Sequence, residues 1–205
     1  MTERVRFYNE YQKPLGRSRI SARLVKDELV LRADRPGFMT LAVNLLDVGL
    51  GRHRSSTFEE VQEWGSGNWY LELEPGSPPL SFVREGTALD MPDGFVYEPP
   101  PFEPNSLLRL EPVPNFAVGI EGTAEQYSLF VLADAASLIS LAKHFLYFGQ
   151  PDVPSGEGIT YKASYEPDPK VSRAYQREPR ISKLRVERAS FPQEVPWAKV
   201  GSSKA

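Results

Sequence analysis

Residues 33–49 read ADRPGFMTLAVNLLDVG, and residues 133–149 read ADAASLISLAKHFLYFG. Both stretches begin with Ala-Asp, continue with spaced apolar residues and close on Gly, at a separation of 100 residues. An ungapped alignment of 29–49 with 129–149 gives seven identities in 21 positions. Typical residue frequencies predict about one or two identities by chance. We therefore interpret the chain as an internal duplication.

The repeated stretches have the features of a helix that follows a strand. Asp34 and Asp134 come after β-like runs and before helical periodicity, which is the usual place of an N-cap carboxylate. Apolar residues then recur at i, i+3, i+4, i+7 and i+8 over 38–46 and over 138–146. The closing glycines stand where a left-handed residue would end each helix. We predict two amphipathic helices, each with one buried stripe.

Strand-like segments flank both helices. Those of the first copy are 19–27, 28–34, 68–74 and 80–85. Those of the second copy are 116–122, 127–134, 158–165 and 181–189. Each copy is thus predicted to be a β-β-α-β-β unit, and the fold class to be α+β, with antiparallel sheet or sheets and the two helices packed on one face. We expect the units to join edge to edge into one longer sheet; two separate lobes are the alternative.

The chain of 205 residues is long enough to bury a substantial core, and it divides into four segments. The chain has 19 proline residues, and many of them lie between the two copies. They indicate an extended connector there. The segments are a first repeat with an N-terminal extension at 1–90, a Pro-rich connector at 91–114, a second repeat at 115–190 and a C-terminal tail at 191–205.

The composition disfavours several classes of function. Without cysteine the chain has no disulfide, thiolate nucleophile or cysteine-ligated zinc, which is compatible with a reducing cytoplasm. The formal net charge of −3 disfavours electrostatic binding to nucleic acid or an anionic membrane, and it favours a basic partner. Residues 1–17 are too charged for a signal peptide, and no apolar run approaches a membrane span. We expect a cytoplasmic protein.

No motif for metal binding, nucleotide binding or nucleophilic catalysis stands out. His53 lies between two arginines, and His144 lies on the flank of its predicted helix, where we expect it to face solvent. Neither histidine has the spacing of a metal site. The GSG turn at 65–67 lacks the strand-to-helix context of a nucleophile elbow. We predict no metal, no cofactor and no catalytic residue.

Function is sought in the loops where the copies differ, because duplicated cores preserve packing. The first copy inserts 50–67 after its helix, and a capping-box pattern there predicts a short helix with an acidic side at 57–64. The second copy expands its last hairpin at 166–180. Acidic residues and loop aromatics are the expected partner contacts. These are Glu59, Glu60, Glu63, Trp64, Asp90, Asp93, Tyr165 and Tyr175.

Residues 119–163 combine a strand pair, a helix with Leu141-Ala142, the turn PDVPSG at 151–156 and a returning strand. This stretch resembles the immunity protein 32 family of bacterial polymorphic toxin systems. The family's returning strand bears a histidine that GITYKAS, residues 158–164, does not have. The resemblance implies a non-enzymatic antidote that binds a cognate toxin and occludes its active site.

Three hypotheses follow, and an immunity protein is the leading one. Its partner would be a cognate protein toxin, and an acidic chain suits a toxin that is basic because it attacks nucleic acid. The first alternative is a structural or assembly subunit that acts through protein contacts. The second is an enzyme whose carboxylates, among them Asp90, Asp93, Glu59 and Glu63, lie in a groove between the repeats.

Overall fold

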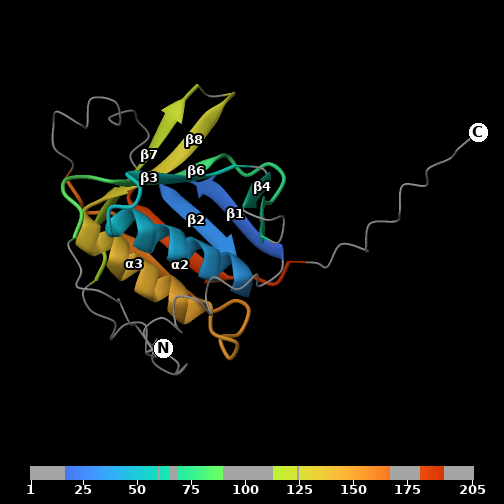
Figure 1. Cartoon of the computed structure of the whole chain (residues 1–205). Coiled ribbons are helices and arrows are strands. Elements are labelled where there is room, and N and C mark those ends of the chain that lie inside the picture. The colour runs from blue at the N-terminus through green and yellow to red at the C-terminus, as the bar shows by residue number, and fades with distance from the viewer. Residues whose placement is uncertain are drawn as a thin grey trace, which may run out of the picture.

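Two helices and two sheets make up the part of the chain that the computed structural model describes, residues 17–59, 61–64, 69–89, 113–123, 125–166 and 181–191 (Figure 1). The first repeat contributes β1 (Arg17–Val25), β2 (Glu28–Ala33), α2 (Arg35–Gly49), β3 (Ser55–Phe58), β4 (Val61–Trp64), β5 (Trp69–Leu73) and β6 (Leu80–Arg84). The second repeat contributes β7 (Phe116–Gly122), β8 (Tyr127–Ala133), α3 (Ala135–Phe148), β9 (Gly158–Lys162) and β10 (Lys183–Arg188). The fold class is α+β, as predicted.

The two helices predicted for the repeats and all eight predicted strands are present, but the third predicted helix, at 57–64, is wrong. Residues 55–58 form β3 and residues 61–64 form β4. Thr57, Phe58, Val61 and Trp64 are β-branched or aromatic residues, which favour strands. A two-turn helix is marginal by itself, whereas β3 and β4 each gain a complete strand partner, β6 and β5.

Strand register identifies which elements of the two repeats correspond. β3 pairs antiparallel with β6, and β9 pairs antiparallel with β10, so that Phe58 faces Leu80 as Tyr161 faces Leu184. The repeat is therefore β1-β2-α2-β3-β6 in the first copy and β7-β8-α3-β9-β10 in the second. The predicted equivalence of 68–74 with 158–165 is wrong, because β4 and β5 form a hairpin inserted into the first copy only.

The repeats exchange their last hairpins. β10 of the second repeat pairs in parallel with β2 of the first, and β6 of the first pairs in parallel with β8 of the second. The resulting sheets have the strand orders β4-β5-β1-β2-β10-β9 and β3-β6-β8-β7. The repeats thus form neither one longer sheet nor two separate lobes. The sheets are mixed instead of wholly antiparallel, because each exchange creates a parallel pair at the junction between repeats and the inserted β5 pairs in parallel with β1.

The two helices run antiparallel and lie side by side, and α2 lies next to β1 and β2 (Figure 1). Gly49 and Gly149 stand at their contact points. A Cβ atom at Gly49 would lie 2.8 Å from Ile139 Cγ1, and one at Gly149 would clash with Met39 Sδ. Neither glycine has the positive φ predicted from its place at a helix end; Gly149 has φ −74°. Close approach of the helices explains both glycines.

One core joins the repeats. Phe38 of α2 packs on Phe145 and Phe148 of α3, with ring centroids 5.6 and 5.1 Å apart, and Phe145 also meets Phe82 of β6. All four rings are fully buried. Burial of each such side chain contributes about 1.5–3 kcal/mol to stability. Because this cluster draws on both repeats, neither repeat has this aromatic core by itself.

The predicted N-caps are confirmed. Asp34 Oδ1 accepts hydrogen bonds from the Gly37 N–H at 2.7 Å and from the Arg19 N–H at 3.1 Å. Asp134 Oδ1 accepts one from the Ser137 N–H at 2.7 Å. These carboxylates satisfy amide groups that a helix start leaves without partners. Both aspartates therefore have a structural role.

Candidate protein-binding surfaces

The structure places four of the residues predicted to contact a partner. Glu59 is exposed and directly follows β3, while Glu63 and Trp64 belong to β4. Tyr165 is half-buried after β9, and its backbone N–H donates to the Phe116 carbonyl at 3.1 Å. The remaining four lie outside the described residues: Glu60, Asp90, Asp93 and Tyr175.

The inserted hairpin brings one group of these residues to the edge of the six-stranded sheet. β4 pairs with β5, with Trp64 opposite Trp69 and Glu63 opposite Tyr70, and β5 pairs in parallel with β1. β4 has no second strand partner among the described residues. An edge strand presents backbone N–H and C=O groups to which another chain can add. Tyr165 lies instead beside β7, the edge of the other sheet.

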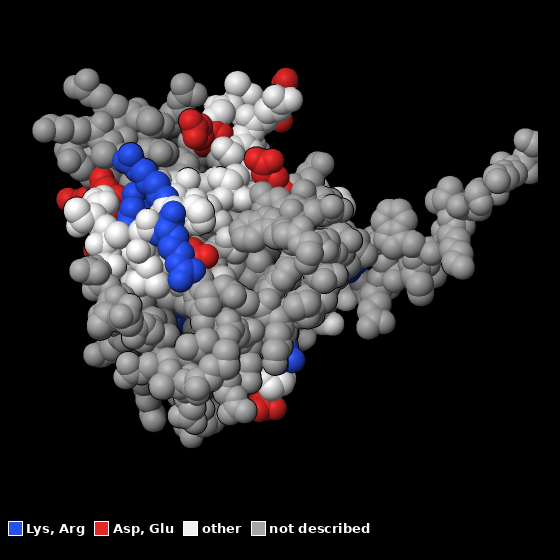
Figure 2. Space-filling view, in the orientation of Figure 1, with Lys and Arg blue, Asp and Glu red and all other residues white. Residues whose placement is uncertain are grey.

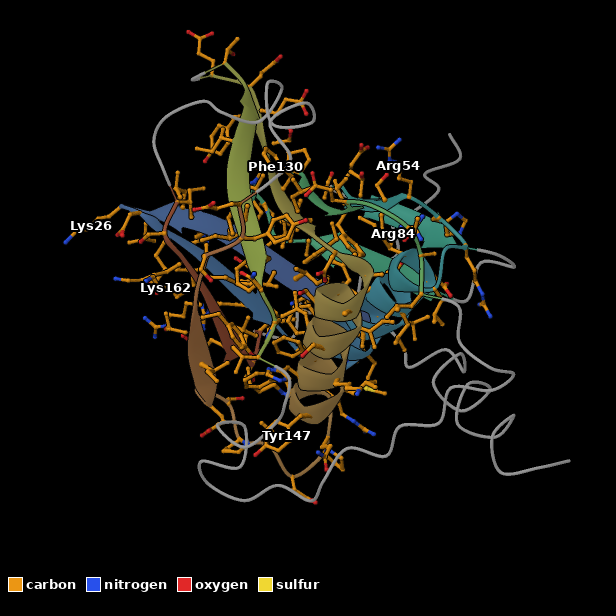
Figure 3. The ribbon with its side chains drawn as sticks, turned by 90° about the vertical axis from the view of Figure 1, so that its left-hand side faces the viewer. Lys26, Arg54, Arg84, Phe130, Tyr147 and Lys162 are labelled. Atoms are coloured by element: carbon orange, nitrogen blue, oxygen red, sulfur yellow. The ribbon has the colours of Figure 1, made fainter. Side chains whose placement is uncertain are left out.

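The outer surface of the six-stranded sheet is a second candidate. Side chains alternate along its strands, so that Leu29, Leu31, Leu184 and Val186 enter the core while their neighbours point outward. We define the open face as the outward-pointing positions within 23–25 of β1, 28–32 of β2, 183–187 of β10 and 158–162 of β9. Figure 3 shows Lys162 on this side of the molecule, with Arg54 and Arg84 on the opposite side.

The open face is rich in basic residues. Its five cations are Arg23, Arg32, Lys162, Lys183 and Arg185, and all five are exposed. Its two carboxylates are Glu28 and Glu187, and Glu187 is shared by the guanidinium groups of Arg32 (3.2 Å) and Arg185 (3.0 Å). The face is therefore positively charged although the whole chain is negative. Sequence reasoning missed this face because strand exchange brings together residues more than 150 positions apart.

Further basic residues lie at the C-terminal end of α2, and Figure 2 shows a stripe of basic side chains on the face it displays. Arg52 Nη1 bonds Asp47 Oδ1 at 2.8 Å, and the Arg84 N–H donates to the Arg54 carbonyl at 2.9 Å. Arg84 Nε and Nη1 are buried and form no hydrogen bond. Because these two atoms are enclosed, they offer no accessible binding site.

A buried polar pair lies between α3 and β9. His144 Nδ1 is 2.6 Å from Tyr161 Oη, and His144 is only 2 % exposed. The prediction that His144 faces solvent is wrong, because the side chain of Tyr161 in β9 contacts the imidazole and α2 packs along α3. Burial raises the pKa of the Tyr161 phenol well above its usual value of 10, so the phenol is neutral. The pair is enclosed, and we assign it a structural role.

Within the described residues, no group of three or more His, Asp or Glu side chains is arranged to hold a metal ion. In the same residues, no helix has the length and apolar character needed to cross a membrane. Comparison with protein-family models, curated proteins and solved structures finds no match to this chain. The proposed function therefore rests on the geometry of the two candidate surfaces.

Proposed function

We propose that this protein acts by stoichiometric binding, as a cytoplasmic immunity protein that neutralises a cognate bacterial toxin by covering its active site. The observation that carries this proposal is the β4–β5 hairpin. The two repeats share every other strand and helix described, and the hairpin is the one described element without a counterpart. An element that the duplicated core does not require is where a binding function is expected.

The composition and place of the hairpin suit a protein contact. β4 is an edge strand and carries Trp64, a residue type enriched among interface hot spots. A partner strand can pair with its backbone, while side chains supply specificity. Glu63 in β4 and Glu59 just before it add negative charge. That charge supports a basic toxin surface as the partner of this edge.

The test pairs the full chain with the product of an adjacent toxin gene. We expect a 1:1 complex by light scattering and rescue of growth when both are expressed. Trp64→Ala combined with Glu63→Lys should weaken the complex at least tenfold and abolish rescue. Val113→Ala, at a side chain that is 70 % exposed and far from the hairpin in sequence, serves as the control. Absence of a complex, or full rescue by the double variant, would contradict the proposal.

The same edge supports the assembly-subunit alternative, because β4 could pair with another copy of the chain. Sedimentation of the purified protein separates the two functions. A concentration-dependent series of oligomers that Trp64→Ala abolishes would favour self-assembly. A monomer that forms a 1:1 complex with a toxin favours the immunity function.

A further inference from the structure

The open face forms continuous rows of side chains across four strands. Arg23 of β1 and Arg185 of β10 both lie in register with Val30 of β2, and Arg185 is also in register with Thr160 of β9. The next row contains Val25, Glu28, Lys183 and Lys162 in the same strand order. This surface exists only because the β9–β10 pair of the second repeat joins β2 of the first repeat.

From this arrangement we infer that the open face is a docking surface for an acidic protein surface. Five exposed cations stand against two carboxylates, and Glu187 already serves two arginines. Exposed ion pairs are weak, so a partner carboxylate can replace Glu187 at low cost. Lys183 and Lys162 lie in register with each other, and Asp27 in the β1–β2 turn offsets part of the charge of Lys183. An added anion would relieve the remaining repulsion between the two lysines. The inference goes beyond the proposed function, which concerns the β4 edge.

The face suits a protein better than a nucleic acid. Val25, which is 51 % exposed, and Val30 stand among the charges and offer apolar contact, which is common in protein interfaces. Glu28 and Glu187 would repel a phosphate backbone, whereas a protein surface can place its own cations opposite them.

The dimensions of the open face set the strength of this contact. Four strands spaced about 4.8 Å apart and about five residues long cover roughly 300 Å². A stable interface buries about 800 Å² on each partner. Binding at the open face is therefore weak, fast and sensitive to salt, unless the partner also covers neighbouring surface.

The test uses the full chain and a fluorescein-labelled oligoglutamate peptide, followed by fluorescence anisotropy at low ionic strength. An oligonucleotide with the same charge and label is titrated in parallel. We expect binding of the peptide that weakens as salt is added and is tighter than that of the oligonucleotide. Reversal of two charges, Arg23→Glu with Arg185→Glu, should weaken peptide binding about tenfold or more. Arg52→Glu with Arg54→Glu gives the same change in net charge at the opposite side and should have a smaller effect.

A second charge-reversed variant, Lys162→Glu with Lys183→Glu, guards against misfolding of the first, and thermal melting is measured for each. The inference is overturned if the wild-type protein does not bind the peptide. It is also overturned if the Arg52/Arg54 variant loses as much affinity as the folded variants of the open face. Tighter binding of the oligonucleotide would assign the face to nucleic acid instead. None of these outcomes depends on the toxin, so the two proposals can fail separately.

Discussion

At the scale of single residues, the Tyr161 hydroxyl is a polar group whose value to stability can be measured. It bonds His144 Nδ1 in a site from which water is excluded. We expect Tyr161→Phe to lower the free energy of unfolding by about 1–3 kcal/mol, because it leaves the buried imidazole without that partner. Urea denaturation measures the change. Tyr127→Phe removes a hydroxyl from a half-buried side chain and is the control; equal losses in both variants would refute the assigned role.

Asp34 gives a prediction about pH. Burial is the largest influence and raises the pKa of Asp34 above 3.8, against the opposing hydrogen bonds from Arg19 and Gly37. Between the unfolded and folded pKa values the folded protein binds more protons, so ionisation of Asp34 costs stability as the pH rises through that window. Asp34→Asn keeps the cap oxygen and removes the charge. We expect it to equal or exceed the wild type in stability at neutral pH, with an advantage that vanishes below pH 3.8.

Urea unfolding at neutral pH and below pH 3.8 measures this difference. Asp34→Ala is the matched control, because it also removes the charge but loses the cap, at a cost of about 1 kcal/mol. If Asp34→Asn were as destabilised as Asp34→Ala at neutral pH, the carboxylate charge itself would be stabilising, and the prediction would be wrong.

Residues with local roles were predictable, whereas residues with non-local surroundings were not. The cap bonds of Asp34 and Asp134 span only three residues, and they followed from the sequence, whereas the bond from the Arg19 N–H to Asp34 did not. The environment of His144 depends on β9, which the periodicity of its own helix does not reveal. The same reason explains Gly49, whose neighbour Ile139 lies in the other repeat.

At the scale of elements, the contact between α2 and α3 can be tested at its two glycines. Gly49→Ala places a methyl group against Ile139, a stiff β-branched side chain, and near the Ala135 carbonyl. We expect a loss of about 1–3 kcal/mol from overpacking, partly offset by the helix propensity of alanine. Gly149→Ala should cost less, because the atom it meets belongs to the flexible side chain of Met39.

Chemical denaturation of the single variants and of Gly49→Ala with Ile139→Ala measures this contact. The loss of stability in the double variant should be smaller than the sum of the losses in Gly49→Ala and Ile139→Ala, because truncating Ile139 relieves the clash. Simple additivity would show that the methyl group is accommodated elsewhere and that Gly49 is not required for helix approach.

Strands were also more predictable than their partners. Alternation and β-branched content located β1, β2 and β5 to β10, whereas β3 and β4 were predicted to be one helix because a capping pattern at Ser56 competes with strand propensity. Of the candidate site, the insertion and the strand β5 were predicted, whereas β4 was predicted to be helical. The open face was not predicted, because basic residues that alternate along separate strands form one surface only if those strands pair in the right register.

At the scale of the whole molecule, hairpin exchange ties the two repeats into one folding unit. β2 is flanked by β1 from its own repeat and β10 from the other, and β8 is likewise flanked by β7 and β6. The first half of the chain alone would lack β10 beside β2, and the second half alone would lack β6 beside β8. The aromatic core is divided in the same way, between Phe38 and Phe82 in one half and Phe145 and Phe148 in the other.

We therefore predict that a chain cut between residues 100 and 101 will fold only as a complex of its halves. Each purified fragment should be unfolded or self-associated, because a folded monomer would leave its hairpin edge and half of the core exposed to water. Mixing should restore the circular dichroism and a single cooperative melt, in a 1:1 complex by sedimentation. If each fragment folds as a monomer and the two do not associate, the repeats are separate lobes. That result would refute the pairing of β2 with β10 and of β8 with β6.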